Sequence, residues 1–581
     1  MKLSKDRISG YIRRNGMVNT SARAAKYLSP GYRRFQVYRD NRYKKYIKET
    51  ALSEEELDFQ RRTDFSYKPF FSILVPLYET DEKYLKELID SVKAQTYIRW
   101  ELCMSDGSGD KERLANILKP YMEEDDRIRL INDQPGPLGI SSNTNQAYKI
   151  MSGDFLVLGD HDDLFAPDAL FECAKALNAD KAIDVIYTDE DKTDSRGEDR
   201  FEPAYKPEFN IDAIGSCNYI THMFVVRKNL VDKVGLLKDE FNGAQDYDFI
   251  LRCTEQAEKI YHLAKPVYSW RINETSTAGN ASNKTYAYEA GTKALQQHYD
   301  RLGLPVKVEQ GEFPGFYNPV YDLSDNPLLS VFLLPPKMEK EDKELEKYLM
   351  DYAEKSITET ATYENIEVIR LTYPPRDEEG NGHRPSRTKL VNDYISEASG
   401  EYVMFMDSRA FLKYETALED MLGIIHGRED VGAVGPKIFD GNGYFRHAGI
   451  ILGKKNMPHG EFLLNEKNDN TLTKYKDYSA LREYVFLTKK SLFNELGGFD
   501  MEYSNYSYSI LDYCLKLGAA GKLSVYNGTS LFGYSTNGEK KKRYSSDVRS
   551  IRRDRVKINE KWKGILKGGD KYYPADKYTE K

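Results

Sequence analysis

The 581-residue sequence predicts an α/β protein with two similar sheet domains, preceded by a basic helical arm. Short apolar runs alternate with helical patterns from Phe71 onward, which is typical of βα units and a largely parallel sheet covered on both faces. The segment 400–407 repeats the pattern of 153–160. A chain of this length also exceeds one ordinary domain, so two or three are expected.

The arm is assigned to residues 1–65 because positive charge gathers there. Residues 1–48 hold fourteen Lys or Arg against two Asp or Glu, interleaved with tyrosines, whereas the whole chain carries a net charge of -7. Such an arm could lie on an anionic membrane surface or pack on the main body, and both alternatives stay open. The acidic remainder of the chain would repel phosphate, so nucleic-acid binding is not expected.

The first domain, predicted over residues 66–325, begins with a strand at Phe71–Val75 that stops at Pro76. A helix follows, with its apolar face between Tyr84 and Val92, and the next strand is Trp100–Met104. Further strands are predicted at 128–131, 155–158 and 184–187, with helices near 141–151 and 167–177.

Two acidic segments follow strands of this predicted sheet. The second strand runs into Ser105–Ser108, and the fourth runs into Gly159–Asp163. Ligands of open α/β sheets bind at the carboxyl ends of the strands. We therefore expect both acidic segments at one ligand-binding edge.

The second domain is predicted over residues 326–581, after a stretch that contains Pro and Gly. Its run Gly400–Asp407 resembles Gly153–Asp160, and each run is followed by a helix-like segment, which indicates an internal duplication at domain scale. The insert Pro374–Arg387 is rich in charge, Pro and Gly and predicts an exposed loop.

Compartment signals favour the cytoplasm. The five cysteines are far apart and form no CxxC pair, which favours free thiols in a reducing compartment. Met1–Arg14 has no apolar core segment of a signal peptide. The longest apolar runs, such as Tyr402–Met406, fall short of the ~20 residues of a membrane helix. We expect a cytoplasmic protein, in peripheral contact with the inner membrane face if the arm binds lipid.

Sugar transfer from a nucleotide diphosphate needs a contact for the base, a cation on the diphosphate and a carboxylate that takes the acceptor proton. Asp160 and Asp162 are candidates to hold a hard divalent cation, and Asp246, at a helix start after Gly243, is a candidate base. Each also has a structural alternative, because Asp is common in turns and at helix caps. The same applies to Asp106, which precedes Gly107.

Together these segments resemble family 2 glycosyltransferases of the GT-A fold, and in particular the two-domain, rhamnosyltransferase-like enzymes of bacterial surface polysaccharide synthesis. The resemblance is strong over about residues 66–305 and looser over 328–535. The segments that carry it are Pro76–Tyr78, Asp106–Ser108, Asp160–Asp163, Tyr187–Lys192, Gly243–Asp248, and Trp270–Arg271 with Ser276–Ala278.

The resemblance implies a role for each matching residue. Asp106 would contact a pyrimidine base, Asp160 and Asp162 would hold Mg²⁺ or Mn²⁺ on the diphosphate, and Asp246 would be the catalytic base of an inverting displacement. Two positions depart from the family pattern, Ser105 and Gln245, and both leave the key carboxylate in place. The nucleotide-sugar site would also include Pro76, Leu77, Tyr78, Glu79 and His161. Further candidates are Arg271 for a phosphate contact, and His222, Gln245 and Trp270 for the acceptor or diphosphate site. For Arg271 and His222, a structural role is an equal alternative.

The second domain lacks these groups. Asp407 is followed by Ser408 and Arg409, where a second metal ligand is needed, and Ile510 aligns with Asp246. A cation would be repelled by Arg409. We expect a degenerate GT-A-like domain that binds acceptor glycan, a partner or the first domain.

The expected function is transfer of rhamnose or another hexose from a UDP- or dTDP-sugar to a growing cell-surface polysaccharide, lipid-linked or free. One alternative is a non-catalytic carbohydrate-binding or scaffold protein of a polysaccharide assembly complex. Another is a sugar nucleotidyltransferase, but such an enzyme needs a glycine-rich basic loop after the first strand, where this chain has Tyr78, Glu79 and Thr80.

Overall fold

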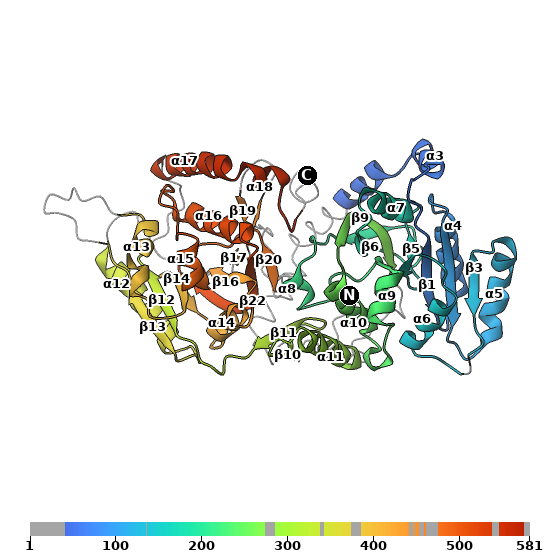
Figure 1. Ribbon diagram of the computed structural model, residues 1–581, viewed down its shortest axis with the longest axis horizontal. Coiled ribbons are helices and arrows are strands. Elements are labelled where there is room, and N and C mark those ends of the chain that lie inside the picture. Colours follow the sequence, from blue (N-terminus) through green and yellow to red (C-terminus); the bar gives the residue numbers. More distant parts are fainter. Residues whose placement is uncertain are drawn as a thin grey trace. The chain divides into compact units, whose positions relative to one another are not determined.

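The computed structural model describes residues 41–134, 136–272, 285–336, 342–373, 385–440, 445–447, 449–452, 458–460, 475–536 and 545–573. The chain forms two compact units (Figure 1). The first comprises Met1–Lys206 and Ile220–Ala290, and the second comprises Pro207–Tyr219 and Gly291–Lys581.

This division differs from the boundary at residue 325/326 that the sequence suggested. The hairpin of β10 (Val306–Gln310) and β11 (Tyr317–Tyr321) belongs to the second unit, because β11 packs against α14 (Ala417–Gly427) there. The excursion Pro207–Tyr219 has no sequence signal of its own.

Side-chain pairing holds this excursion, which contains α8 (Ile211–Ile214), in the second unit. Asn210 and the backbone of Asp477 exchange two hydrogen bonds of 2.9 and 3.0 Å. The Arg428 guanidinium lies 2.6 Å from the Asp212 carboxylate, and both side chains are buried. A buried ion pair of this kind is costly to break, so the excursion is an integral part of the second unit.

The first unit is built on a nine-stranded sheet with the order β3-β2-β1-β4-β8-β6-β9-β5, in which β7 pairs with β6. Strands β2, β1 and β4 are parallel, β8 is antiparallel to both neighbours, and β9 is parallel to β6. The strands are β1 (Phe71–Leu77), β2 (Trp100–Asp106), β3 (Ile128–Ile131), β4 (Phe155–Leu158), β5 (Leu164–Phe165), β6 (Val185–Thr193), β7 (Arg200–Ala204), β8 (Phe224–Arg227) and β9 (Ile260–Arg271).

Helices cover this sheet on both faces, as the alternation of apolar runs predicts. On one face, α4 (Glu82–Lys93), α5 (Lys111–Glu124) and α7 (Ala169–Ala179) pack their apolar sides on alternate residues of the central strands. Asp81 caps α4 by accepting a hydrogen bond from the Lys83 amide. On the other face, α6 (Ile140–Lys149) packs against β1 and β2.

The second sheet has the order β13-β12-β14-β21-β16-β22-β15, with β17 on β16 and β20 on β22. Each strand of the first sheet except β3 has a counterpart in the same order and orientation. The strands are β12 (Leu329–Leu334), β13 (Ile366–Arg370), β14 (Tyr402–Asp407), β15 (Ala410–Leu412), β16 (Val431–Asp440), β17 (Phe445–His447), β20 (Lys476–Tyr478), β21 (Val485–Lys489) and β22 (Leu523–Tyr534).

The two units also share a hydrogen-bonded corner. The Gly153 amide donates to the Ser72 hydroxyl at 2.9 Å, and the Gly400 amide donates to the Ser330 hydroxyl at 2.8 Å. A Cβ on Gly153 would lie 2.6 Å from the Phe70 carbonyl oxygen, so the position requires glycine. The predicted α/β class with a second, similar sheet is therefore confirmed.

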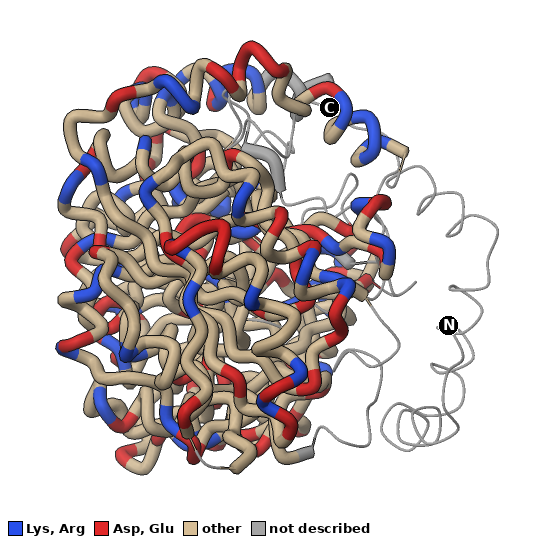
Figure 2. The backbone as a smooth tube through the Cα atoms, turned by 90° about the vertical axis from the view of Figure 1, so that its right-hand side faces the viewer, with Lys and Arg blue, Asp and Glu red and all other residues tan. Residues whose placement is uncertain are grey.

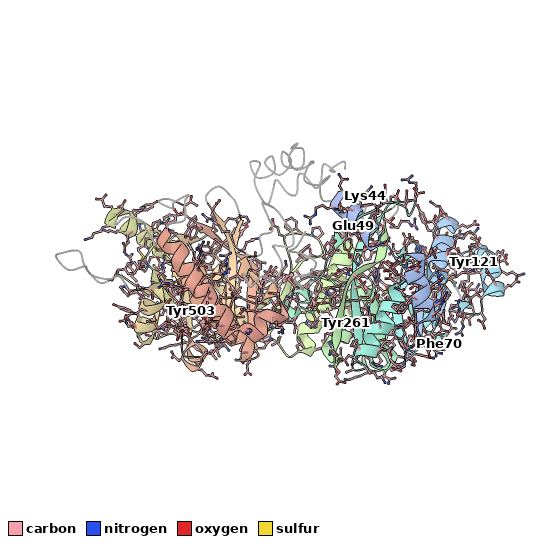
Figure 3. All side chains as sticks on the ribbon, turned by 90° about the horizontal axis from the view of Figure 1, so that it is seen from above. Lys44, Glu49, Phe70, Tyr121, Tyr261 and Tyr503 are labelled. Atoms are coloured by element: carbon pink, nitrogen blue, oxygen red, sulfur yellow. The ribbon has the colours of Figure 1, made fainter. Side chains whose placement is uncertain are left out.

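The described end of the N-terminal arm packs on the first unit. Residues 41–50 are helical, and Tyr43 is 4% exposed. The Tyr43 hydroxyl donates to the Asp191 carboxylate at 2.5 Å, and Lys44 lies 3.0 Å from Asp199. Lys44 and Glu49 are labelled on this helix in Figure 3. Residues 1–40, on which the membrane alternative mainly rests, lie outside the described residues.

The described residues show the distribution of charge, the state of the cysteines and the hydropathy of the helices. Basic and acidic residues are interspersed along the described backbone (Figure 2). All five cysteines are buried free thiols. Among the helices in the described part of the chain, none is long and apolar enough to cross a membrane.

Candidate active site

The carboxyl ends of β1 and β2 bring Leu77 beside Asp106 in the strand register. Asp106 is 1% exposed, and its Oδ1 accepts a hydrogen bond from the Ser108 amide at 2.9 Å. Its buried Oδ2 has no hydrogen-bond partner among the described residues. A buried acceptor without a partner is costly, and an imide N–H of a pyrimidine base is a donor that would satisfy it.

The strand end beside Asp106 is rigid. The Leu77 carbonyl accepts from the Gly107 amide and from the Asn143 side chain, both at 2.9 Å. Glu79 has a positive φ of 47°, and its amide donates to the Ser108 hydroxyl at 2.9 Å. These bonds fix the backbone after Pro76 and leave the Tyr78 ring 54% exposed. Tyr78 can thus offer an aromatic face to a nucleotide.

At the end of β4, the Tyr268 hydroxyl joins two backbone segments. It accepts from the Asp160 amide at 3.0 Å and donates to Asp163 Oδ2 at 2.7 Å. Asp163 Oδ1 accepts from the Arg271 amide at 2.8 Å. Ligand atoms of Asp160, Asp163 and His222 lie within 4.8 Å of one another. Both Asp163 oxygens are already engaged, however, so Asp163 supports the loop.

Burial is the main cause of a pKa shift at Asp163. Burial and then the negative charge of Asp160 raise the pKa of Asp163 well above its ordinary value. The sequence places Asp163 in the acidic motif, but it gives no sign that this carboxyl is structural.

The Arg271 side chain is engaged by groups within the first unit. This side chain is fully buried, and Nε donates to the Asp162 carbonyl at 2.6 Å. Its other nitrogens lie 3.2 Å from the Ser195 carbonyl and 2.7 Å from the Glu87 carboxylate. The guanidinium also lies over the Tyr84 ring at 4.6 Å. Arg271 therefore holds the backbone of the acidic loop, and its guanidinium is not exposed to a phosphate.

His222 lies against the acidic loop. Its Nε2 is 3.3 Å from Asp160 Oδ2, and its ring stacks on Tyr268 at 4.9 Å. The Trp270 ring meets it edge-on at 5.9 Å. Burial alone would lower the pKa of His222, but the Asp160 carboxylate, by its charge and hydrogen bond, raises it to about 9. At neutral pH His222 is thus protonated and supplies a positive charge beside Asp160.

A buried ion pair positions His222. The Lys206 ammonium lies 3.1 Å from Glu190 and donates to the carbonyls of Ile220 and His222. Glu190 accepts from the His222 amide at 3.1 Å and from the Thr221 hydroxyl at 2.7 Å. Thr221 has a positive φ of 42°, a conformation that costs free energy and is common at functional sites. Sequence reasoning missed Lys206 and treated Glu190 only as part of a motif.

Asp246 lies in the first turn of α10 (Gln245–Gln256). Gly243 precedes this helix with φ of 97°, and a Cβ there would lie 2.6 Å from the Tyr286 ring. The Gln245 side chain accepts from the Gly243 amide at 2.8 Å, so it closes the turn. Burial raises the pKa of Asp246, while the nearby His222 charge lowers it in part. A carboxylate with a raised pKa is a stronger proton acceptor.

The acidic loop has a suitable donor set for a divalent cation. The Asp160 side chain is 37% exposed, so a ligand from solvent can reach it. Carboxylate oxygens of Asp160 and Asp162 are hard ligands of the kind that Mg²⁺ and Mn²⁺ prefer. His161 Nδ1 is buried without a hydrogen-bond partner within the described residues. The residues present therefore fit a divalent cation.

The equivalent edge of the second unit has different chemistry. Asp407 occupies the position of Asp160, and Arg387 lies 2.8 Å from its carboxylate. Arg409 follows where Asp162 stands in the first unit, and Ile510 is fully buried in α16 (Tyr506–Ala519). Guanidinium groups in place of carboxylates do not bind a cation.

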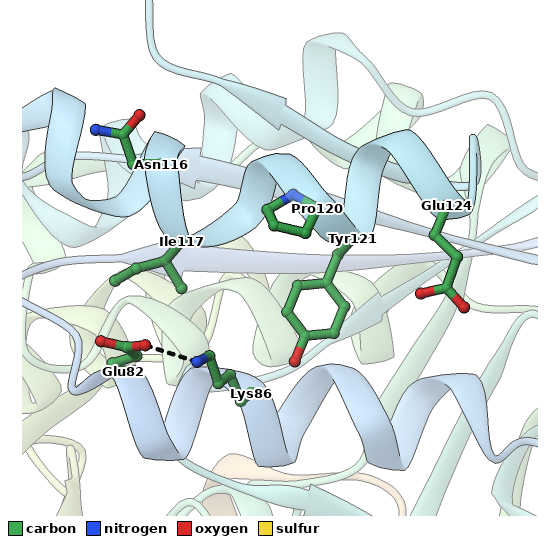
Figure 4. A pocket seen from close by; sticks show the side chains of 7 residues that line it. All are labelled: Glu82, Lys86, Asn116, Ile117, Pro120, Tyr121 and Glu124. Atoms are coloured by element: carbon green, nitrogen blue, oxygen red, sulfur yellow. Dashed lines mark hydrogen bonds and ion pairs between the residues drawn. The ribbon is translucent and has the colours of Figure 1, made fainter.

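A pocket of about 600 Å³ lies elsewhere on the first unit, between α4 and α5 (Figure 4). Glu82, Lys86, Ile117 and Tyr121 are among its lining residues, and Lys86 pairs with Glu82 at 2.6 Å. The residues that line it include none of the predicted site residues.

Comparisons with known proteins agree with the predicted family. Residues 72–235 match the model of Glycosyl transferase family 2. The chain is 30% identical to the uncharacterized protein y4gI of Sinorhizobium fredii, over 84% of this chain and 56% of that protein. It is 28% identical to the O-antigen biosynthesis protein RfbC of Myxococcus xanthus, over 75% of this chain and 35% of that protein. The chain thus spans about half or less of these relatives.

Among solved structures, S. aureus TarS 1-349 in complex with UDP-GlcNAc aligns with a TM-score of 0.33 and 20% identity, over 39% of this chain and 66% of that one. The family match covers β1 through α9 (Lys228–Val234), where the acidic loop and His222 lie. Residues 72–235 therefore match a domain of Glycosyl transferase family 2.

Proposed function

We propose that the first unit is a metal-dependent, inverting glycosyltransferase that uses a UDP- or dTDP-sugar and extends a cell-surface polysaccharide. The observation that carries this proposal is that Asp106 and Asp160 stand at strand ends, and Asp246 at a helix start, of the unit that holds the family 2 match, with His222 3.3 Å from Asp160. The name of the Myxococcus xanthus relative, an O-antigen biosynthesis protein, supports polysaccharide as the product class.

Each residue has a distinct part in this proposal. Asp106 Oδ2 accepts the imide N–H of uracil or thymine, and Tyr78 offers its ring to the base. Asp160 and Asp162 hold the divalent cation, which when bound stabilises the negative charge of the leaving diphosphate. His222, 3.3 Å from Asp160, can donate a hydrogen bond at the same place.

Asp246 performs the proton transfer. The acceptor hydroxyl attacks the anomeric carbon from the face opposite the diphosphate, and its proton passes to the Asp246 carboxylate. The bond to the diphosphate oxygen breaks as the new glycosidic bond forms, so the configuration inverts. The raised pKa of Asp246, caused by burial, favours this transfer.

A thermal-shift panel tests the donor class. UDP, dTDP and GDP are each added with and without Mn²⁺, and GDP serves as the purine control. A ligand that binds only the folded state stabilises it by about 2.7 kcal/mol at a hundredfold excess over its dissociation constant. We expect a metal-dependent shift with a pyrimidine nucleotide. A shift with GDP alone, or with none of the three, contradicts the proposal.

A further inference from the structure

The second unit carries a polar cluster at the edge that corresponds to the active site of the first. The cluster consists of Arg387, Asp407, Ser408, Glu483, Tyr506 and Tyr534. These residues come from the start of α13 (Arg387–Tyr394), the end of β14, the segment before β21, the start of α16 and the end of β22. In the first unit, the matching strand ends and helix start carry the acidic loop, His222, Trp270 and Asp246.

The second unit lacks one of the two carboxylates that would hold a metal ion in the first unit. Strand register places Phe411 opposite Gly533 and Leu412 opposite Phe532, as it places Leu164 opposite Ser269 and Phe165 opposite Tyr268 in the first unit. With Asp407 at the position of Asp160, Arg409 replaces Asp162 and Ala410 replaces Asp163. Two carboxylates are thus lost and one guanidinium is gained.

Arg387 supplies a second, fixed cation. Its NH1 lies 2.8 Å from Asp407 Oδ2, and its NH2 donates to the Pro335 carbonyl at 2.6 Å. The two side chains are only 9% and 5% exposed, respectively. Because this ion pair is buried and directional, it neutralises Asp407 permanently and excludes a divalent cation from that carboxylate.

Four buried polar atoms of the cluster have no hydrogen-bond partner in the described parts of the chain: Arg387 Nε, Ser408 Oγ, Glu483 Oε2 and the Tyr506 hydroxyl. Ser408 is 1% exposed and Tyr506 is 7% exposed. The charges of Arg387, Glu483 and Asp407 all act on the Tyr506 hydroxyl, so these groups are near neighbours. Native proteins rarely leave such groups unsatisfied, so these four atoms are free to accept or donate to a polar partner from outside the described residues.

The donor and acceptor pattern identifies the class of ligand. Arg387 Nε can only donate, Glu483 Oε2 can only accept, and the two hydroxyls do both. An anion without hydroxyl hydrogens offers only acceptors, and any anion would be repelled by Glu483. Sugar hydroxyls both donate and accept. The charges of Arg387, Arg409, Asp407 and Glu483 balance, which suits an uncharged ligand.

We propose that this cluster is a metal-independent binding site for an uncharged saccharide unit. The site is separate from the donor site of the first unit and goes beyond the proposed function. It would retain a glycan chain without cleaving or extending it, because Ile510 stands in place of the base.

Binding is tested on the full chain in EDTA, without nucleotide, by saturation-transfer NMR with methyl glycosides of glucose, galactose, mannose, N-acetylglucosamine and rhamnose at millimolar concentration. Tyr506→Phe and Ser408→Ala each remove one unpartnered oxygen without opening a large cavity. Each should weaken binding about threefold to tenfold, the usual effect of one hydrogen bond. The unfolding temperature should stay unchanged, because neither oxygen has a partner to lose among the described residues.

Tyr348→Phe is the matched control, because its hydroxyl lies on the exposed α12 (Lys343–Thr358) of the same unit. It should leave glycoside binding unchanged. Saturation transfer in EDTA that both cluster variants weaken supports the proposal. The proposal is overturned if no glycoside binds, if binding requires Mn²⁺, or if binding ignores both variants. It is also overturned if inorganic phosphate, and no glycoside, binds in a Tyr506-dependent way. Failure of the pyrimidine nucleotide panel leaves this test unaffected.

Discussion

Substitutions of Asp246 and Asp248, which lie two residues apart in α10, should distinguish an effect on the rate of sugar transfer from an effect on stability. Asp246→Asn keeps the size and shape of the side chain but cannot take a proton. If the carboxylate is the base, the rate of sugar transfer should fall by about 10²-fold to 10⁴-fold, while the affinity for the nucleotide stays the same. The control, Asp248→Asn, should leave the transfer rate per folded molecule intact.

The stability of the two variants should change in opposite directions. Asp248 is fully buried and lies 2.7 Å from Arg252, whose guanidinium also contacts the carbonyls of Val234, Gly235 and Leu236. Removal of one partner of a buried ion pair costs about 3–5 kcal/mol. At about 2–4 °C per kcal/mol, the unfolding temperature should fall by roughly 6–20 °C.

Asp246→Asn should instead be slightly more stable than the parent at pH 7. The pKa of Asp246 is raised above its ordinary value of 3.8 in the folded state, so the parent loses stability as the pH rises from 3.8 through the folded pKa. The variant has no such loss, and the difference should vanish below pH 3.8. Calorimetric unfolding at several pH values and a transfer assay with labelled donor measure both effects. Transfer by Asp246→Asn near the parental rate would refute the assignment.

Three further predictions test the site and the arm. Asp162→Asn should abolish metal-dependent UDP or dTDP binding in calorimetric titration, and an unchanged titration would remove Asp162 from the site. In EDTA, His222→Gln should lower the free energy of unfolding by about 1–3 kcal/mol below pH 6.5. The free energies of unfolding of the parent and the variant should converge as the pH rises through about 9, the raised pKa of His222, because the pairing with Asp160 is lost there. A constant difference in free energy across this pH range would contradict the pairing. Tyr43→Phe should speed amide exchange over residues 41–50, since a hydrogen bond to a charged group stabilises by about 1.5–3 kcal/mol. Lys44→Ala should barely change the amide exchange rate of this helix, because the ion pair of Lys44 with Asp199 is half-exposed.

Much of the fold followed from local patterns. The alternation of apolar runs and helical faces predicted the strands from Phe71 to Tyr187, and the repeat at Gly400 predicted the second sheet. The placement of Asp106 and Asp160 at strand ends needed only the rule that carboxyl ends share an edge. Their roles in binding and catalysis remain predictions.

Other features depend on contacts between residues that are distant in sequence. Arg271 is buried against the Asp162 carbonyl because β9 lies beside the acidic loop. The amino-acid composition does not predict this arrangement. The sequence alone does not distinguish Lys206 from a surface lysine, because its partner Glu190 lies beside it only in the folded chain. The excursion Pro207–Tyr219 is paired with Asp477, more than 250 residues away, so no sequence window could assign it to the second unit.

That excursion affects how the protein can be divided and how it unfolds. The chain passes between the units at three points, after Lys206, Tyr219 and Ala290, so no single cut separates them. A fragment ending at residue 325 would lack Asp477 and Arg428 and would expose the excursion. The Lys206 ammonium donates to the Ile220 carbonyl and so closes the excursion at its base. We therefore expect a short linker from Lys206 to Ile220 to allow the first unit to fold as an autonomous fragment. In the intact chain, we expect unfolding of the second unit to release the excursion, which begins and ends beside the Lys206–Ile220 hydrogen bond.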